Sequence, residues 1–464
     1  MGRLARMAAA FAATFFLAQA AVGEATAHQQ LARDILAELV AINTAPSGGS
    51  DMRPAVRAIA ARLKNAGFSE DDIDVVGATD KLANLVVRYE SPNPQDDPLL
   101  MMAHIDVVEA LPEDWTVPPF ALTEKDGWLY GRGTTDNKAG AAILIANFIR
   151  LKQEGFEPNR DLIIMLTGNE ETTGGGASLL ANEERELIDA EYALNTDGGM
   201  IIAENGEPQA FIMQTSEKVY VSYTFEATDP GGHSSVPRAD SAISRLARVL
   251  VDLEEFNFPI SLNETTRAFF RHWAPLAPPD VQPAIETLLE NPADPELSAN
   301  LVKWPYYNAL ARTTCVATML DGGHAENALP QTAQATVNCR VVPQSTEEET
   351  QNVLAAIAAK QGVTVTQIDP AKPSPPSPLD PEIVEPISAV AEAMWPGIPV
   401  IPEMSTGATD GLFLRNVGIP VYAVSAIAED PADQRAHGKD ERIRVEAYYD
   451  ALEYWYRLVK MLSE

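Results

Sequence analysis

Acidic and imidazole side chains recur at six places along the chain, each shortly after an apolar run. In the clearest case, Glu170 and Glu171 follow the run at 162–166. Two neighbouring carboxylates at the end of a buried strand cost free energy unless a positive charge lies beside them. Carboxylates with few imidazoles and no thiolates are the ligands that a two-metal hydrolase needs. The other five places hold His104 with Asp106, Asp136, Asp197, Asp410 and His437.

The spacing of His104 and Asp106 suits a metal site. An extended backbone points residues two apart in the same direction. A metal-bound imidazole often has a carboxylate partner that orients it, and Asp106 suits that role. The ordinary alternative is a structural histidine. For Asp136, in a glycine-rich turn before a helix, the ordinary alternative is an N-cap, although its two oxygens could also bridge two cations.

The adjacent glutamates should have different tasks. Neighbouring residues of an extended segment point in opposite directions, so Glu170 and Glu171 cannot bind one ion in the same way. We expect one to be a metal ligand and the other to face the attacking water as general base. In open α/β sheets, ligands bind beyond the carboxyl ends of the strands, where His104, both glutamates and Asp197 fall.

Length and charge limit the class of protein. A chain of 464 residues exceeds what one hydrophobic core usually supports, so two domains of unequal size are expected. It carries 34 Lys+Arg against 66 Asp+Glu, a formal net charge of −32. Such a surface repels phosphate backbones and anionic lipid headgroups, which argues against nucleic-acid and membrane-surface binding. Solubility is the simplest reason for this acidity, which identifies no substrate.

The first residues resemble a secretory signal. Arg3 and Arg6 precede the apolar run 7–21, and small residues follow in Ala-Gln-Ala and Ala-Thr-Ala patterns. The run is too short to span a bilayer comfortably. We therefore expect residues 1–27 to be a signal peptide, with the mature chain starting near Val22 or His28. The protein would be exported to the periplasm or the medium.

The order of apolar runs predicts two modules. From 28 to 214, amphipathic helices alternate with buried strands, which indicates an α/β domain with a mixed, mainly parallel sheet covered by helices. Residues 376–464 resume it. Residues 215–375 carry alternating strands and two helices, which predicts an inserted α+β domain with an antiparallel sheet. The aromatic and proline-rich segment 256–307 is expected to elaborate this inserted domain.

Two cysteines, Cys315 and Cys339, lie on expected strands that flank the Gly322-Gly323 turn. Export permits oxidation, so a cross-strand disulfide is open to them. A pair of buried free thiols is the alternative that we prefer on sequence alone. Neither cysteine has metal-ligand spacing.

Several short strings together resemble one enzyme family. In chain order they are MMAHIDVV, LYGRGTTDNKAG, LTGNEET, NTDGG, GGHSSVP, GGHAENALP, NCRVVP, STGATDG and HGKDE. They resemble motifs of the dizinc metallopeptidase family that contains glutamate carboxypeptidase, aminoacylase, acetylornithine deacetylase and succinyl-diaminopimelate desuccinylase. The likeness runs from about residue 31 to 460. The segments WTVPPF and RTTCVATMLDGG are similar to the branch of Gly-X carboxypeptidase and the secreted N-acyl-amino-acid hydrolases.

The resemblance implies a zinc-peptidase-like catalytic domain that binds two Zn²⁺ ions per chain, which Co²⁺ or Mn²⁺ could replace. One ion would be held by His104 and Asp197, and the other by Glu171 and His437. Asp136 would bridge both ions. Some relatives carry glutamate in place of Asp197, so its shorter side chain bears on the geometry of the first ion.

The resemblance also implies roles around the ligands. Glu170 would be the general base and proton shuttle, and Asp106 would support His104. The peptide bond between Asp136 and Asn137 is cis in relatives. Asp410 is expected to buttress the loop that shapes the binding pocket rather than to bind metal.

The inserted domain would then be a lid and dimerisation domain. His233 matches a residue that, in dimeric relatives, reaches the partner's active site to stabilise the oxyanion. Asn327 and Arg340 match groups that hold the substrate, and Arg340 suits a terminal carboxylate. Gly407 and Thr409 match the pocket loop. Judged by spacing alone, Arg340 would be an ordinary strand-face charge and His233 a turn residue.

The expected function is zinc-dependent hydrolysis of an amide bond next to a free carboxylate in small peptides, as in a carboxypeptidase. Hydrolysis of N-acyl amino acids is the alternative with the same mechanism. The aromatic residues of the segment 256–307 could line a pocket for an apolar group, although packing is their simpler use. An exported peptide-binding protein without catalysis is the remote alternative, which the intact Glu170 disfavours.

Overall fold

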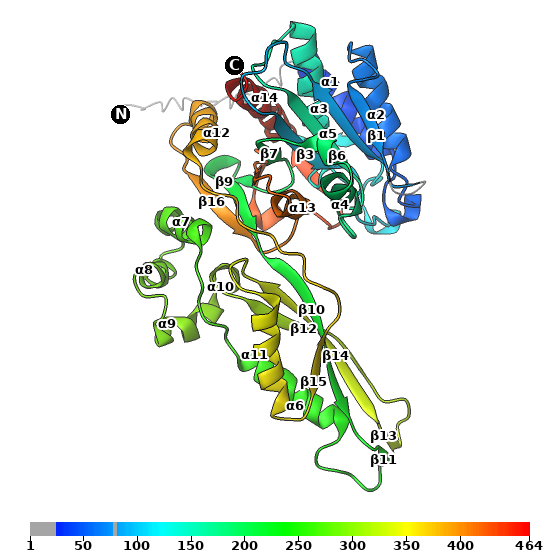
Figure 1. The fold of residues 1–464 in the computed structure, drawn as a ribbon, viewed down its shortest axis with the longest axis vertical. Coiled ribbons are helices and arrows are strands. Elements are labelled where there is room, and N and C mark those ends of the chain that lie inside the picture. The colour runs from blue at the N-terminus through cyan, green and yellow to red at the C-terminus, as the bar shows by residue number, and fades with distance from the viewer. Residues whose placement is uncertain (1–24, 78–80) are drawn as a thin grey trace, which may run out of the picture.

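The computed structural model describes residues 25–77 and 81–464, which form a large α/β body and an elongated module projecting from it (Figure 1). The body is built on a mixed sheet of ten strands in the order β1-β2-β6-β3-β7-β17-β9-β8-β18, with β16 paired to β9. Neighbours β6, β3, β7 and β17 are parallel. The strands are β1 (Ile73–Val76), β2 (Asn84–Tyr89), β3 (Leu99–His104), β6 (Leu162–Thr167), β7 (Tyr192–Asn195), β8 (Met200–Glu204), β9 (Glu207–Glu217), β16 (Val400–Ser405), β17 (Val421–Ala423) and β18 (Ala428–Glu429).

Helices cover both faces of this sheet, as the sequence predicts. Alternate side chains of β3 and β6 point into two separate apolar cores. One core is closed by α1 (Ala27–Ala41), α2 (Arg53–Asn65), α3 (Lys138–Glu154), α12 (Pro381–Met394) and α14 (Val445–Met461). The other is closed by α4 (Gly175–Asn182), α5 (Arg185–Ile188) and α13 (Gly411–Asn416). A small sheet at the edge of the body joins β4 (Thr123–Lys125), β5 (Trp128–Tyr130) and β19 (Arg442–Arg444).

The projecting module is an antiparallel sheet with helices on one face, which agrees with the expected inserted domain. Its strand order is β12-β14-β10-β15, and α6 (Ala242–Glu255) and α11 (Glu347–Ala359) pack on it. The strands are β10 (Val219–Thr228), β12 (Thr314–Gly322), β14 (Thr332–Val341) and β15 (Thr364–Gln367). A two-stranded ribbon of β11 (Gly232–His233) and β13 (Ala328–Leu329) lies at its far end (Figure 1).

Four helices within the inserted segment pack differently from our expectation. They are α7 (Glu264–Trp273), α8 (Gln282–Glu290), α9 (Pro295–Asn300) and α10 (Pro305–Ala311). Their buried side chains share one core with Ala210, Ile212 and Ile401 of β9 and β16. The aromatic segment therefore extends the large body instead of the small sheet, because its apolar faces cover the outer part of the large sheet.

The cysteines correct a second expectation. Cys315 and Cys339 face each other across β12 and β14 and form a disulfide bond. Buried free thiols, which we preferred on sequence, are therefore wrong. The expected signal peptide falls almost wholly outside the described residues. In the part that is described, no helix combines the length and apolar character needed to cross a membrane.

Candidate metal centre

The strand register brings the predicted ligands to one edge of the sheet. In the parallel pair β3–β6, His104 lies opposite Thr167, and in β3–β7, Met102 lies opposite Asn195. The segments that follow β6 and β7 therefore leave the sheet beside His104. They carry the two glutamates and Asp197, which places these side chains at the carboxyl edge expected from the sequence.

Asp136 lies between the two histidines. Its Oδ1 is 2.8 Å from Nε2 of His104, and its Oδ2 is 3.0 Å from Nε2 of His437. The same His437 nitrogen is 2.9 Å from Oε2 of Glu171. One oxygen of Asp136 thus faces each imidazole, which is the arrangement of a bridging carboxylate.

The local backbone explains this position of Asp136. Its peptide bond to Asn137 is cis, as the resemblance predicts. Asn137, not Asp136, occupies the N-cap position of α3. The Asn137 side chain accepts a hydrogen bond from Thr196 Oγ1 at 2.6 Å and donates one to Thr196 O at 3.1 Å. This pair holds the turn after β7 against the turn that carries Asp136, and it leaves the aspartate free of helix capping.

Two overlapping groups of side chains could each hold a cation. Ligand atoms of His104, Asp136 and Glu171 lie within 4.8 Å of one another, and so do those of His104, Glu170 and Asp197. All of the predicted metal ligands and the predicted general base therefore meet in one place. Their individual roles remain predictions.

Asp106 contacts the imidazole of His104 and also the backbone of the two glutamates. The Nδ1 atom of His104 is 3.1 Å from the main-chain carbonyl of Asp106 and 3.7 Å from its Oδ1. The two carboxylate oxygens accept the backbone N–H groups of Glu170 and Glu171, each at 3.1 Å. Asp106 therefore fixes the main chain of both glutamates as well as lying beside His104.

Asp410 lies beneath this cluster, at the start of α13. Its Oδ2 accepts a hydrogen bond of 2.6 Å from Thr167 Oγ1. Its other oxygen is buried without a hydrogen-bond partner among the described residues. The contact with Thr167 ties the pocket loop to the end of β6, as expected of a buttress.

The electrostatics show an excess of buried negative charge. Burial raises the pKa of Glu170 to about 10 and the pKa of Asp197 to about 7, and neighbouring carboxylates contribute to both shifts. Burial would also raise the pKa of Asp136, but hydrogen bonds from His104 and His437 outweigh it and hold that pKa well below its usual range. The imidazoles therefore offset only part of the charge that the carboxylates would carry.

These residues fit a pair of divalent cations. The Oε1 atom of Glu171 is buried and has no hydrogen-bond partner among the described residues, as expected of an oxygen that awaits a ligand. Imidazole nitrogens and carboxylate oxygens are the donors that zinc and similar ions take in hydrolases. Bound cations would also offset the excess negative charge.

The predicted substrate residues and the predicted oxyanion residue His233 divide into two groups. Arg340 and Tyr220 pair at the end of the small sheet that joins β9, and the guanidinium lies 4.7 Å from the Tyr220 ring centroid. Within residues 25–77 and 81–464, Arg340 has no carboxylate partner. Gly407 and Thr409 lie near the same junction, where Thr409 N donates to Glu217 Oε2 at 3.0 Å. These three residues thus lie where the inserted module leaves the large body.

His233 and Asn327 lie at the opposite end of the inserted module. His233 is on β11, and Ser234 N donates to Asn327 O at 3.0 Å. The ten residues of β10 separate this ribbon from the junction, a span of roughly 30 Å at the usual rise per residue. The two side chains therefore do not reach the metal cluster of their own chain.

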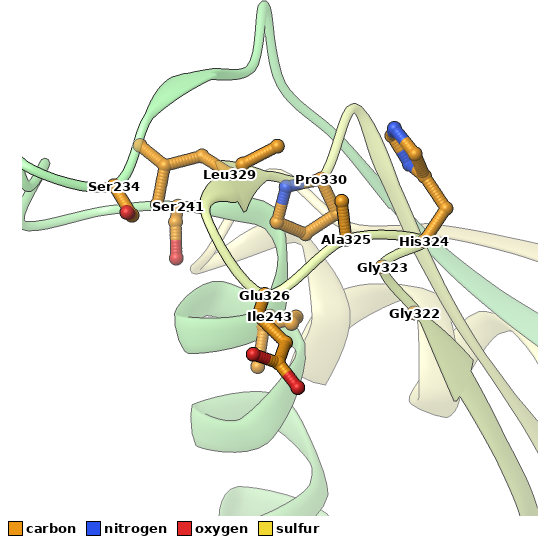
Figure 2. A pocket seen from close by; sticks show the side chains of 11 residues that line it. Ser234, Ser241, Ile243, Gly322, Gly323, His324, Ala325, Glu326, Leu329 and Pro330 are labelled. Atoms are coloured by element: carbon orange, nitrogen blue, oxygen red, sulfur yellow. The ribbon is translucent and has the colours of Figure 1, made fainter.

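A hollow of about 580 Å³ opens beside this ribbon (Figure 2). It lies between the start of α6 and the loop that follows β12. Ser234 and Glu326, the neighbours of His233 and Asn327, contribute to its lining. The far end of the module is therefore hollowed next to the predicted oxyanion residue His233 and the predicted substrate residue Asn327.

Sequence reasoning missed two buried ion pairs near the site. Glu441 and Arg132 form an ion pair of 2.6 Å, and Glu217 lies 3.1 Å from Arg415. Arg132 and Glu441 occur in the strings LYGRGTTDNKAG and HGKDE, so an unexplained charge within a quoted motif was the available signal. Glu217 lies in no such string, and nothing in its spacing marks it.

The comparisons with known proteins agree with this geometry. The model of "Peptidase family M20/M25/M40" matches residues 100–461. The N-fatty-acyl-amino acid synthase/hydrolase of Homo sapiens is 30% identical over 382 residues, which cover 80% of this chain and 75% of that protein.

Solved structures share the fold. An M20 family metallo-carboxypeptidase from Sulfolobus solfataricus superposes with a TM-score of 0.70 at 19% identity, over 93% of this chain and 99% of that one. A Bacillus subtilis protein described as a dinuclear metal-binding peptidase from the M20 family gives a TM-score of 0.58 at 15% identity, over 94% and 98% of the two chains. This chain therefore belongs to peptidase family M20/M25/M40 and is a metallohydrolase that acts on amide or peptide bonds.

Proposed function

We propose that the protein is a dizinc exopeptidase of carboxypeptidase type, which cleaves an amide bond next to a free carboxylate in small peptides. The observation that carries this proposal is Arg340, a half-buried cation without a carboxylate partner among the described residues, at the junction that leads to the acidic cluster. A guanidinium in this state suits the terminal carboxylate of a substrate. Gly407 and Thr409 would shape the pocket beside it.

Five side chains would hold the two ions. His104 and Asp197 would bind one, Glu171 and His437 the other, and Asp136 both, because its two oxygens face different imidazoles. Zinc suits this mixture of nitrogen and oxygen donors, and Co²⁺ or Mn²⁺ are the substitutes. When bound, the ions supply the positive charge that activates water and polarises the scissile carbonyl.

Glu170 would move the proton. Asp106 fixes the backbone N–H of Glu170, and the Glu170 carboxylate lies within 4.8 Å of ligand atoms of His104 and Asp197, close enough to reach the attacking water. Without metal ions, burial and neighbouring carboxylates raise the pKa of Glu170. Bound cations would lower that pKa again, so that the carboxylate could take a proton from water and return it to the leaving nitrogen. Asp106 would thereby position both the base and the ligand next to it.

The test is the variant Glu170→Gln. We expect the metal content to stay at two ions per chain while kcat falls by roughly 10²–10⁴, the usual contribution of a general base. Asp126→Asn, on an exposed turn between β4 and β5, is the control and should change neither. Normal turnover of Glu170→Gln would exclude this role.

Hydrolysis of N-acyl amino acids is the second candidate, favoured by the similarity to the human N-fatty-acyl-amino acid enzyme. Both substrate classes offer an amide and a carboxylate, so the metal cluster serves either. A panel of dipeptides, acetyl amino acids and long-chain acyl amino acids separates them by kcat/KM. Preference for acyl amino acids would replace the carboxypeptidase proposal without affecting the metal site.

We also propose that residues 215–375 form the inserted domain and that residues 28–214 and 376–464 form the catalytic domain. Two copies of the protein would assemble through the inserted domain. The edge strand β12 exposes Val316, Met319 and Leu320 by 61, 68 and 71%. An exposed apolar edge strand favours pairing with another strand. In such a dimer, the distant His233 and Asn327 could enter the partner's site.

Mixing two inactive variants tests this arrangement. In a mixed dimer, the His233→Ala subunit keeps Glu170 and receives an intact His233 from the Glu170→Gln subunit, so one of the two sites is complete. Mixing His233→Ala with Glu170→Gln should therefore restore activity. Random exchange in a symmetric dimer predicts about a quarter of the normal rate. No recovery after exchange, verified by co-purification of two differently tagged copies, would contradict the shared site.

Export to the periplasm or medium is a further proposal. Thr26 and Gln29 form a capping box at the start of α1. Cleavage before Val22 would keep this cap, whereas a start at His28 would remove Thr26. Mass spectrometry of the exported protein should therefore find Val22 at the N-terminus.

A further inference from the structure

A buried ion pair joins segments that carry three of the proposed ligands. Arg132 Nη1 lies 2.6 Å from Glu441 Oε2, and both side chains are almost completely shielded from water. Burying two charges is costly unless further hydrogen bonds satisfy their remaining atoms. The contacts of this pair therefore indicate what it holds in place.

Glu441 holds the turn that carries Asp136. Its Oε2 accepts the N–H of Gly133 at 3.1 Å, and its Oε1 accepts those of Thr135 at 2.7 Å and Asp136 at 3.0 Å. These bonds fix the main chain directly before the proposed bridging carboxylate. Glu441 thus fixes the main chain that leads to Asp136.

Arg132 holds two more segments. Its Nη2 donates to the carbonyl of Gly438 at 2.9 Å and to that of Glu109 at 3.2 Å. Gly438 follows His437, and Glu109 lies a few residues after His104. One guanidinium therefore connects the loop of His437 to the segment that leaves β3.

The proposed ligands differ in how much they need this support. His104 ends a central strand, and Asp197 follows another by two residues. His437 lies on a loop, has a side chain that is 56% exposed, and has a φ of 61°. Without Arg132 and Glu441, its loop would lose a hydrogen bond that fixes it.

We propose that Arg132 and Glu441 are positioning residues for one of the two ions, the one shared by Asp136, Glu171 and His437. The ion at His104 and Asp197 shares the disturbance of Asp136 but keeps two ligands that lie on or directly after central strands, so it depends on them less. This inference rests on the proposed two-metal function. It assigns to the pair a selective effect on metal binding rather than a general effect on stability.

The test is the metal content of Glu441→Gln in zinc-buffered solution. The amide keeps the size of the carboxylate, but both oxygens of Glu441 accept N–H groups. In either orientation of the amide, its NH₂ group would therefore replace one acceptor with a donor that faces another N–H. We expect the variant to keep one tightly bound zinc, with the Kd of the second ion raised about 10–100-fold, as is usual when a supporting partner of a ligand is lost. Arg132→Lys should give a smaller rise in the same Kd, because one ammonium cannot reach all three acceptors.

Asp161→Asn is the control, since Asp161, just before β6 at the end of the sheet away from the cluster, pairs with Arg88 and accepts the N–H of Ser91. It should lower the melting temperature and still bind two ions with normal affinity. If Glu441→Gln binds both ions with normal affinity, or binds both with equally reduced affinity, the inference is wrong. If Glu441→Gln does not fold, the two metal affinities of Arg132→Lys decide by the same criteria. Failure of the wild-type protein to bind two ions would instead overturn the proposed function.

Discussion

Reduction of the disulfide should lower the stability of the inserted domain by a predictable amount. Cys315 and Cys339 are separated by 24 residues, for which loop-closure entropy gives about 3.5 kcal/mol at 25 °C. For a domain of this size, that loss corresponds to a fall of roughly 7–14 °C in Tm. The bond also joins the edge strand β12 to β14, beside the register position of Arg340.

Scanning calorimetry with and without tris(2-carboxyethyl)phosphine measures this shift. The double variant Cys315→Ala/Cys339→Ala is the control, because it should melt at the lower temperature and show no response to the reductant. Thiol titration of the unfolded, unreduced protein should find no free thiol. Two reactive thiols, or an unchanged Tm after complete reduction, would refute the reasoning.

Two further predictions concern stability. Burial lowers the pKa of Lys218 to about 7, and nearby Arg340 adds to the shift. Between pH 7 and the usual lysine pKa, the unfolded chain therefore binds more protons than the folded protein. The free energy of unfolding should rise with pH across that interval, by up to about 1.4 kcal/mol per pH unit. Lys218→Met should remove this slope in urea titrations at pH 7, 8 and 9, and a persistent slope would assign it to other groups. Gly155 ends α3 with a φ of 67° and has open space where a Cβ would lie, so Gly155→Ala should cost about 1 kcal/mol by backbone conformation alone. A neutral or stabilising effect in the same denaturation assay would contradict that account.

The central strands and the ligand set could be predicted from sequence because both depend on local pattern. The apolar runs at 99–103 and 162–166 are buried on both faces, so they can only be central strands. Parallel pairing then brings His104 and the glutamates to one edge. The cis bond at Asp136 was also predicted, but from the resemblance and not from the residues.

Other features depend on contacts that no local pattern records. Glu441 accepts hydrogen bonds from main-chain N–H groups roughly 300 residues earlier in the chain. Every residue except proline carries such a group, so the sequence does not mark the partners of Glu441. The aromatic segment 256–307 is apolar enough to be buried, but its composition does not say which sheet it covers. The register of β12 and β14, which places Cys315 opposite Cys339, is likewise set across a long connection.

The central claim is that Asp136 bridges two ions held by side chains from distant parts of the chain. Anomalous diffraction at the zinc edge, on crystals of the zinc-loaded protein, tests it most directly. We predict two peaks about 3.5 Å apart on either side of Asp136, the usual spacing of a two-metal site, with the Glu170 carboxylate outside both coordination spheres. A single peak, or a Glu170 oxygen bound directly to zinc, would contradict the account.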